Sequence, residues 1–326
     1  MKRSRHIAGI ALATLALSCH RGAANSPAAP DAGPLVFSFP ILELSQITQI
    51  VPLGNVNPPG HTLPTNHIYW FHPAVNAVVT APASGRVTDV RHDADDSITI
   101  QATSHASYYL YHLILDATIT SGSSVTAGQR LGVTVATAGG LDLGLFTDEV
   151  TLFFVRPDRY IPLTLHADSP LKYFSEPTRT ALYSKVSRAG ADKDGRINFD
   201  QAGRLSGNWF LDGLPAGTTE NFENGPKHLS FAKHVMDPAT NIVSIGGSLS
   251  VVGAFYLAES APDPGGVSTG SGRVVYELFT SPSRSGANNA HLMVQLVADD
   301  RIRIEAFPAG APIPDDFSAG SLVYTR

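Results

Sequence analysis

The sequence predicts an all-β protein built from two β-rich units and a short helical connector. Only 16% of its 326 residues are charged, and glycine (29) and proline (23) are plentiful, a balance that disfavours long helices. Short runs of β-branched residues alternate with Gly- and Pro-bearing turns from about residue 35 to 154 and again from about 201. The chain length favours two domains over one.

The N-terminal segment is typical of an export signal. Lys2, Arg3 and Arg5 precede an apolar stretch at 7–17, which is too short to span a bilayer as a helix of about 20 residues. Cys19, the only cysteine, follows this stretch and cannot form an internal disulfide.

This start resembles a bacterial lipoprotein signal, so we expect a signal peptide at 1–19 and lipidation of Cys19. The alternative is secretion by cleavage near Ala23-Ala24, which would discard the cysteine. Lipidation implies an exported protein anchored in the bacterial envelope, and His20 in place of the aspartate associated with inner-membrane retention favours the outer membrane.

Residues 20–34 are rich in Ala, Pro and Gly and are expected to form a flexible tether. The net charge is −5, and the mature part has no Lys/Arg run, so we expect no nucleic-acid partner. Contact with a membrane is expected only through the N-terminal lipid.

Three further segments complete the predicted organisation. The first β-unit spans 35–167, and its opening stretch at 35–44 is expected to be a strand. The connector spans 168–200, with Pro170 in the first turn of a helix that Pro177 interrupts, followed by a polar loop.

The second β-unit spans 201–326 and is expected to be a barrel or a sandwich. Its Gly207-Asn208-Trp209 triplet is similar to the start of calycin barrels, the lipocalin class. That resemblance implies an Arg near the chain end that covers the Trp, and Arg326 is available.

Three ordered motifs lie in the first unit. They are Val79-Val-Thr-Ala-Pro-Ala-Ser-Gly85-Arg-Val87, Tyr111-His112-Leu113 and Gly122-x-x-Val125-x-Ala127-Gly128-Gln129-x-x-Gly132. The block resembles the core of the M23 (lysostaphin-type) peptidases, which carry V-x-A-P-x-x-G-x-V, Y-x-H-L and G-x-x-V-x-A-G-Q-x-x-G in that order. The resemblance covers roughly 50–155 and implies a curved antiparallel sheet with a groove across one face.

Members of that family are zinc hydrolases that cut peptide cross-links in peptidoglycan. The resemblance implies zinc held by an H-x-x-x-D motif and by the second His of an H-x-H motif. The Y-x-H-L histidine positions the attacking water, so His112 is the catalytic candidate.

The chain departs from this ligand pattern. Four residues after His67 stands Phe71 instead of Asp, and the H-x-H positions hold Asp142 and Gly144. A catalytic zinc needs three protein ligands and one open position, and glycine offers no donor. If zinc is retained, His67 and Asp142 are the expected ligands; otherwise we expect no cofactor.

The groove candidates are His61, Asn66, His67, Tyr69 and Asp142. Each histidine and the aspartate also has a plainer interpretation: His112 as a strand histidine bonded to a carbonyl, His61 and His67 as loop-fixing residues, and Asp142 as a turn residue.

These observations predict an M23-like envelope lipoprotein that binds or scaffolds at peptidoglycan or at a partner protein, with the missing ligands arguing against enzyme activity. Two alternatives remain. One is a zinc metalloendopeptidase acting on peptidoglycan cross-links with rearranged ligands. The other is a small-ligand-binding β-barrel lipoprotein.

Overall fold

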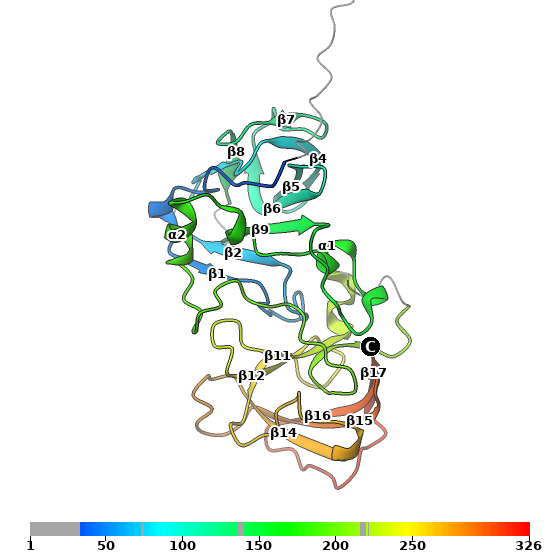
Figure 1. Cartoon of the computed structure of the whole chain (residues 1–326). Coiled ribbons are helices and arrows are strands. Elements are labelled where there is room, and N and C mark those ends of the chain that lie inside the picture. Colours follow the sequence, from blue (N-terminus) through cyan, green and yellow to red (C-terminus); the bar gives the residue numbers. More distant parts are fainter. Residues whose placement is uncertain (1–32, 73–74, 136–139, 216–219, 221) are drawn as a thin grey trace, which may run out of the picture.

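The computed structural model describes residues 33–72, 75–135, 140–215, 220 and 222–326 (Figure 1). It is almost entirely β, with one open antiparallel sheet and one closed barrel. The expected signal peptide, the expected lipidation site Cys19 and most of the expected tether lie outside the described residues. Within the described ranges, no helix is both long enough and apolar enough to cross a membrane.

The first unit is a nine-stranded sheet in the order β1-β2-β9-β6-β5-β4-β7, with β8 pairing β6 and β3. Its strands are β1 (Gln49–Val51), β2 (His67–Phe71), β3 (Val78–Thr80), β4 (Gly85–His92), β5 (Asp96–Gln101), β6 (Ala106–Leu115), β7 (Ser124–Val125), β8 (Arg130–Thr134) and β9 (Gly140–Thr147). The stretch at 35–44 is not the expected strand. It is irregular chain with several bends that forms an isolated bridge to Phe174 through Phe37 and leads into the 3-10 helix η1 (Leu44–Gln46).

Alternation along β2 and β9 explains how the sheet packs. Successive side chains on a strand point to opposite faces. Ile68 and Trp70 of β2 are fully buried in the core, where Trp70 contacts the Phe174 ring at 5.9 Å between centroids. Leu141 and Leu143 of β9 join the same core. The side chains that alternate with them, including Asp142, therefore lie on the opposite face of the sheet.

The helical segments in and just before the connector are all short, and the first two precede residue 168. These are η2 (Pro157–Arg159), α1 (Pro162–Leu165), η3 (Pro170–Tyr173) and α2 (Thr178–Tyr183). Pro170 lies in the first turn of η3, and Pro177 stands immediately before α2. The single interrupted helix expected here is therefore two separate segments, because Pro177 cannot donate the backbone hydrogen bond that would continue the first.

The second unit is a closed barrel of eight antiparallel strands, so the barrel alternative is confirmed over the sandwich. Its strands are β10 (Gly207–Leu211), β11 (His228–Lys233), β12 (Asn241–Ile245), β13 (Gly253–Leu257), β14 (Arg273–Phe279), β15 (Ala290–Ala298), β16 (Arg301–Pro308) and β17 (Leu322–Thr325), with 3-10 helices η4 (Phe222–Lys227) and η5 (Thr269–Ser271). Trp209 lies in its apolar core, and the Arg326 guanidinium stacks 4.2 Å above the Trp209 ring centroid.

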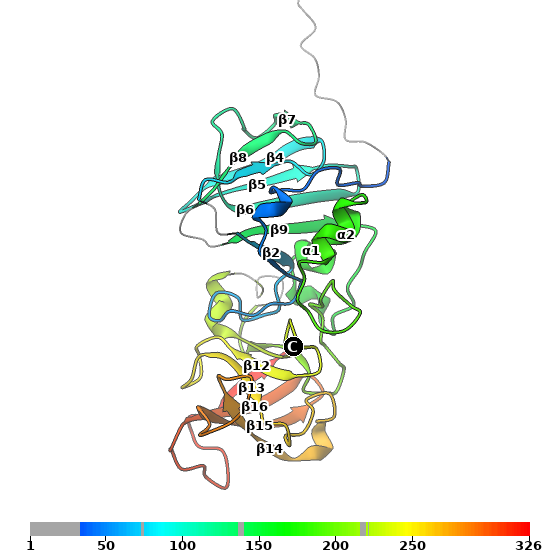
Figure 2. The ribbon, with the colours of Figure 1, turned by 90° about the vertical axis from the view of Figure 1, so that its left-hand side faces the viewer.

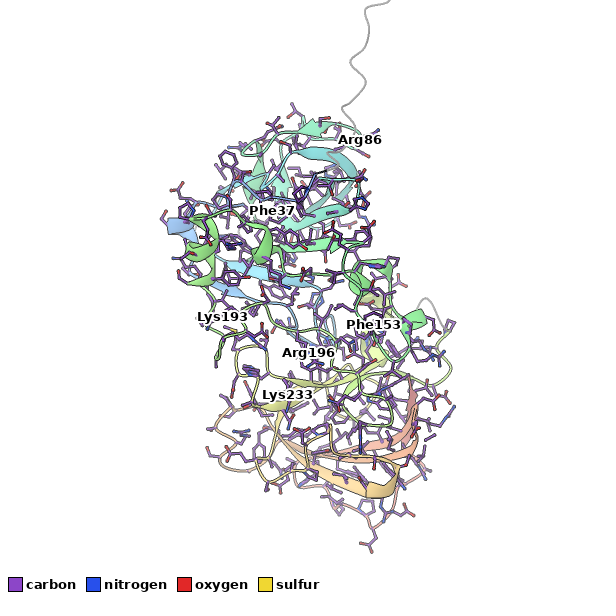
Figure 3. All side chains as sticks on the ribbon, in the orientation of Figure 1. Phe37, Arg86, Phe153, Lys193, Arg196 and Lys233 are labelled. Atoms are coloured by element: carbon purple, nitrogen blue, oxygen red, sulfur yellow. The ribbon has the colours of Figure 1, made fainter. Side chains whose placement is uncertain are left out.

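The sheet and the barrel are docked on each other, with the connector running between them (Figures 1 and 2). The Thr62 hydroxyl donates to the Gly225 carbonyl at 2.8 Å, and the Ala189 amide donates to the Met236 carbonyl at 2.8 Å. Phe153 and Arg196 lie in the band between the two units (Figure 3). The loop that precedes β2 is thereby held against the barrel.

Candidate functional site

The open face of the sheet carries two rows of side chains set by strand register. The first row pairs Tyr69, Asp142 and Tyr111, and the second pairs His67, Gly144 and Tyr109. In each row the central residue belongs to β9 and its neighbours to β2 and β6. Asp142 is therefore a strand residue on the groove face, and the interpretation of Asp142 as a turn residue is wrong. His67 likewise opens β2 instead of lying in a loop.

His112 reaches the same face through a β-bulge. On β6, Tyr111 pairs with Ser97 and Leu113 pairs with Asp96, which leaves His112 without a pairing partner on β5. Its φ of +69° is uncommon for a residue other than glycine. Strict alternation would place His112 on the face opposite Tyr111, and the bulge instead turns its ring toward Asp142.

Gly144 leaves a space that the Tyr109 ring fills. A Cβ built on Gly144 would lie 1.9 Å from Tyr109 Cζ and 2.3 Å from its hydroxyl oxygen. Tyr109 is almost completely buried, and its hydroxyl donates to Asn66 Oδ1 at 3.0 Å. The position at which the resemblance implies a histidine ligand is thus occupied by a phenol from the neighbouring strand.

A chain of hydrogen bonds fixes the His67 ring. His67 Nδ1 lies 3.1 Å from Asn66 Oδ1, and Asn66 Nδ2 donates to Thr164 Oγ1 at 2.9 Å. The Thr164 hydroxyl donates to the Glu220 carboxylate at 2.5 Å. This chain links the sheet to α1 and to the barrel side of the groove. Burial raises the pKa of Glu220 to about 7.

Asp142 lies between two histidines whose pKa values are shifted in opposite directions. Its Oδ2 is 3.4 Å from His67 Nε2 and 3.4 Å from His112 Nε2. Burial lowers the pKa of His67 to about 4, against the attraction of Asp142. The bond to Asp142, aided by a 2.8 Å contact between His112 Nδ1 and Asp95 Oδ2, raises the pKa of His112 to about 9 despite partial burial. At neutral pH His67 is neutral and His112 is a cation.

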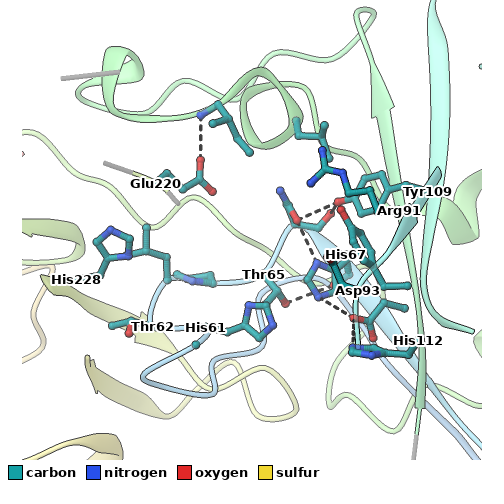
Figure 4. A pocket seen from close by; sticks show the side chains of 18 residues that line it. His61, Thr62, Thr65, His67, Arg91, Asp93, Tyr109, His112, Glu220 and His228 are labelled. Atoms are coloured by element: carbon teal, nitrogen blue, oxygen red, sulfur yellow. Dashed lines mark hydrogen bonds and ion pairs between the residues drawn. The ribbon is translucent and has the colours of Figure 1, made fainter. Parts of the chain in front are cut away.

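These side chains line a cavity of about 600 Å³ at the junction of the sheet and the barrel. Figure 4 shows His61, His67, His112 and Tyr109 on one side and the barrel-side residues Glu220 and His228 on the other. The His61 ring lies 5.3 Å from the His67 ring between centroids, and burial lowers the pKa of His61. Arg91 and Asp93 reach the cavity from the hairpin between β4 and β5.

The donors do not fit the zinc ion that the M23 resemblance implies. Three protein donors must surround one point, and here His67 Nε2 and one Asp142 oxygen are the two donor atoms that face each other. His112 is protonated and donates toward Asp142, and Phe71 presents a hydrocarbon ring. Across the described ranges, no group of three or more His, Cys, Asp or Glu side chains could hold a metal ion. The groove geometry supports no zinc-dependent hydrolytic step.

The five predicted groove residues and the catalytic candidate His112 all lie around this cavity or next to it. His61, Asn66, His67, His112 and Asp142 line it, and the Tyr69 ring packs 5.0 Å from the His67 ring. Tyr109 was not predicted, although the period of two from Tyr111 places it on the groove face. Asp95, Thr164 and Glu220 were not predicted either, because no local pattern connects them to the motifs.

Comparisons with known proteins give only distant matches. No family model matches the chain, and no curated protein matches it. Solved structures that resemble it include a zinc-containing peptidase from Vibrio cholerae, with 20% identity over 34% of this chain and 37% of that one at a TM-score of 0.30. Helicobacter pylori Csd3 matches with 15% identity over 46% of this chain and 40% of its own, at a TM-score of 0.32.

Pseudoalterin, an M23 metalloprotease from the deep sea, matches with 14% identity over 43% of this chain and 88% of its own, at a TM-score of 0.28. The chain spans less than half the length of the first two structures. With identities and TM-scores this low, the resemblance to the M23 peptidases rests on the three sequence motifs.

Proposed function

We propose that this chain is an exported, lipid-anchored protein of the bacterial envelope whose M23-like groove binds the peptide part of peptidoglycan without cutting it. The observation that carries the proposal is the Tyr109 ring in the space above Gly144. It removes the third ligand position while keeping a polar cavity next to it. A binding groove needs the cavity and its hydrogen-bonding groups but not the metal.

Three features of the cavity support binding. It has a volume of about 600 Å³, within the range of sites that take small molecules or short chain segments. Buried polar side chains line it, and their orientations are fixed by hydrogen bonds from neighbouring elements. The barrel supplies one wall, so the site is formed only when the two units are docked.

Co-sedimentation with purified sacculi tests the proposal. The mature chain is expected to pellet with sacculi and release no soluble fragments, and its zinc content is expected to be well below one ion per chain. Asp142→Asn should weaken sedimentation, whereas Asp212→Asn, an exposed barrel carboxylate paired with Arg301, should leave it unchanged.

Stoichiometric zinc together with cross-link cleavage that His67→Ala abolishes would establish the zinc endopeptidase instead. A second contrary outcome is a chain that fails to sediment but captures an envelope protein, with the capture lost in Asp142→Asn. That result would show that the groove binds a protein partner and not peptidoglycan. Small-molecule binding by the barrel stays a separate prediction, tested by native mass spectrometry of the purified chain. Radiolabelled fatty acid incorporation, lost in Cys19→Ser, tests the lipid anchor.

A further inference from the structure

The hydrogen bonds around His67 fix which ring nitrogen carries the proton. Asn66 donates through its amide nitrogen to Thr164, so its oxygen is left to accept from both the Tyr109 hydroxyl and His67 Nδ1. The His67 ring is buried and its Nδ1 already donates to Asn66, and burial favours the neutral form of such a ring. A neutral imidazole with its proton on Nδ1 presents Nε2 as a lone pair that can only accept.

That lone pair faces another acceptor. His67 Nε2 lies 3.4 Å from Asp142 Oδ2, and no donor lies between them. Nε2 is buried, and no residue in the described part of the chain hydrogen-bonds to it. A buried acceptor without a donor is destabilising by roughly 1–3 kcal/mol. Such an atom in a cavity wall indicates a missing donor that the chain does not supply.

The charged side chains around the cavity indicate which charge the missing donor carries. Two cationic side chains stand at the cavity, His112 and Arg91. The carboxylates on or next to it are Asp89, Asp93, Asp95, Asp142 and Glu220, the last with a pKa that burial raises to about 7. The local balance is negative, so a cation is favoured over a neutral or anionic group. The rings of Tyr109 and Tyr111 also line the cavity, and the faces of aromatic rings attract cations.

A primary ammonium group satisfies all of these features. It carries three N–H donors and no acceptor, so one nitrogen about 2.9 Å from both atoms can donate to His67 Nε2 and Asp142 Oδ2 together. Water could donate to both but brings no charge. A metal ion would need a third protein donor, and the Tyr109 ring occupies that position.

We propose that the cavity recognises its ligand through a primary ammonium group that donates to both His67 Nε2 and Asp142 Oδ2, an inference that rests on the proposed binding function. The group is either the α-amine at the end of a peptide or the ε-amine of a diamino acid side chain. Both present the same donor, and they differ in the carbon chain that must fit behind it.

Isothermal titration calorimetry with the mature chain separates these sources. Triglycine offers an α-amine, Nα-acetyl-lysine amide offers an ε-amine, and N-acetyl-triglycine offers neither. At pH 7 at least one of the two amines is expected to bind about tenfold or more tightly than N-acetyl-triglycine, in line with hydrogen bonds to charged groups. The tighter of the two identifies the source.

Variants locate the binding and guard against misfolding. Asp142→Asn keeps the shape of the side chain but removes its charge, and should reduce amine affinity about tenfold. Asp212→Asn on the barrel should change nothing. Thermal melting of each variant, with a midpoint within a few degrees of the parent, shows that the loss is local.

The remaining outcomes separate the two proposals. Sacculi that still bind after acetylation of their free amines, together with equal affinity for all three probes, would sink the ammonium inference and leave the binding function standing. Absence of binding to both sacculi and amines would sink both. Stoichiometric binding of zinc chloride that competes with triglycine would replace the ammonium group with a metal ion.

Discussion

The barrel core and the groove both bury polar groups next to aromatic rings, but they satisfy them differently. In the barrel, Arg326 stacks on Trp209 and donates to the carbonyls of Gln201 and Arg204, while Trp209 Nε1 donates to Leu205. In the groove, His67 Nε2 and Asp142 Oδ2 face each other as two acceptors. The barrel also keeps buried atoms without a hydrogen-bond partner, Arg326 Nε among them, but His67 Nε2 differs because its residue lines a cavity that a ligand can enter.

The largest expected effect is on the barrel, where Trp209→Ala tests whether the satisfied Trp–Arg pair stabilises the fold. The change removes a fully buried ring and the surface on which Arg326 stacks. The free energy of unfolding should fall by about 3–5 kcal/mol, measured by urea denaturation. Val297→Ala, at an exposed position of β15, should cost much less. A loss below about 1 kcal/mol for Trp209→Ala would mean that the Trp–Arg pair is not central to the barrel.

For the groove, the pH dependence of stability tests the burial of His67. The pKa of His67 is about 4 in the folded chain against 6.5 for an unperturbed histidine, so the unfolded state binds a proton first as the pH falls. Its contribution to stability is full above pH 6.5 and is lost as the pH falls through 4, on the order of 3 kcal/mol. Glu220, with a raised pKa of about 7, acts in the opposite sense over much of this range.

The two effects offset each other in the parent chain, so the comparison must be made against His67→Gln. Urea denaturation at pH 7, 5.5 and 4 should show the parent losing about 3 kcal/mol relative to this variant. Parallel stability profiles of the parent and the variant would show that His67 has the same pKa in the folded and unfolded states, which would contradict the prediction.

The sequence predicted the fold better than it predicted the site. Alternating apolar residues and Gly/Pro turns were enough for an all-β chain, but they left barrel and sandwich open for the second unit, and the structure shows the barrel. The strand predicted at 35–44 was wrong because Phe37 packs against Phe174 of the connector. This long-range contact overrides the strand propensity of the segment.

For the site, the motif positions of His67, His112 and Asp142 could be predicted, but their chemistry could not. The bulge at His112 depends on the register with β5, and the charge of its ring depends on Asp95 and Asp142, which no spacing rule connects. The neutral state of His67 follows from its burial in the folded chain. Burial and register are properties of the folded chain.

A smaller effect tests the Tyr109–Gly144 pair. Gly144→Ala would place a methyl group 1.9 Å from Tyr109 Cζ and should cost about 1–3 kcal/mol in unfolding free energy. Gly140→Ala is the matched control on the same strand and face, because its nearest neighbours lie 3.6 Å away, an ordinary contact. In a Tyr109→Ala background the Gly144→Ala penalty should largely vanish. Equal costs at Gly144 and Gly140 would contradict the filled-space interpretation.

The smallest effect concerns which carboxylate holds the charge on His112. Asp95 is closer, at 2.8 Å against 3.4 Å for Asp142, but the Asp142 side chain is only 5% exposed against 25% for Asp95. Because attraction weakens with solvent screening, Asp142→Asn should lower the His112 pKa from about 9 by more than Asp95→Asn does. An NMR titration of the His112 ring measures both shifts, and the stability that His112 contributes is present below pH 6.5 and lost as the pH rises through 9. A larger shift in Asp95→Asn would mean that distance outweighs burial here, and that the more exposed Asp95 contributes more than Asp142 to the negative charge balance around the cavity.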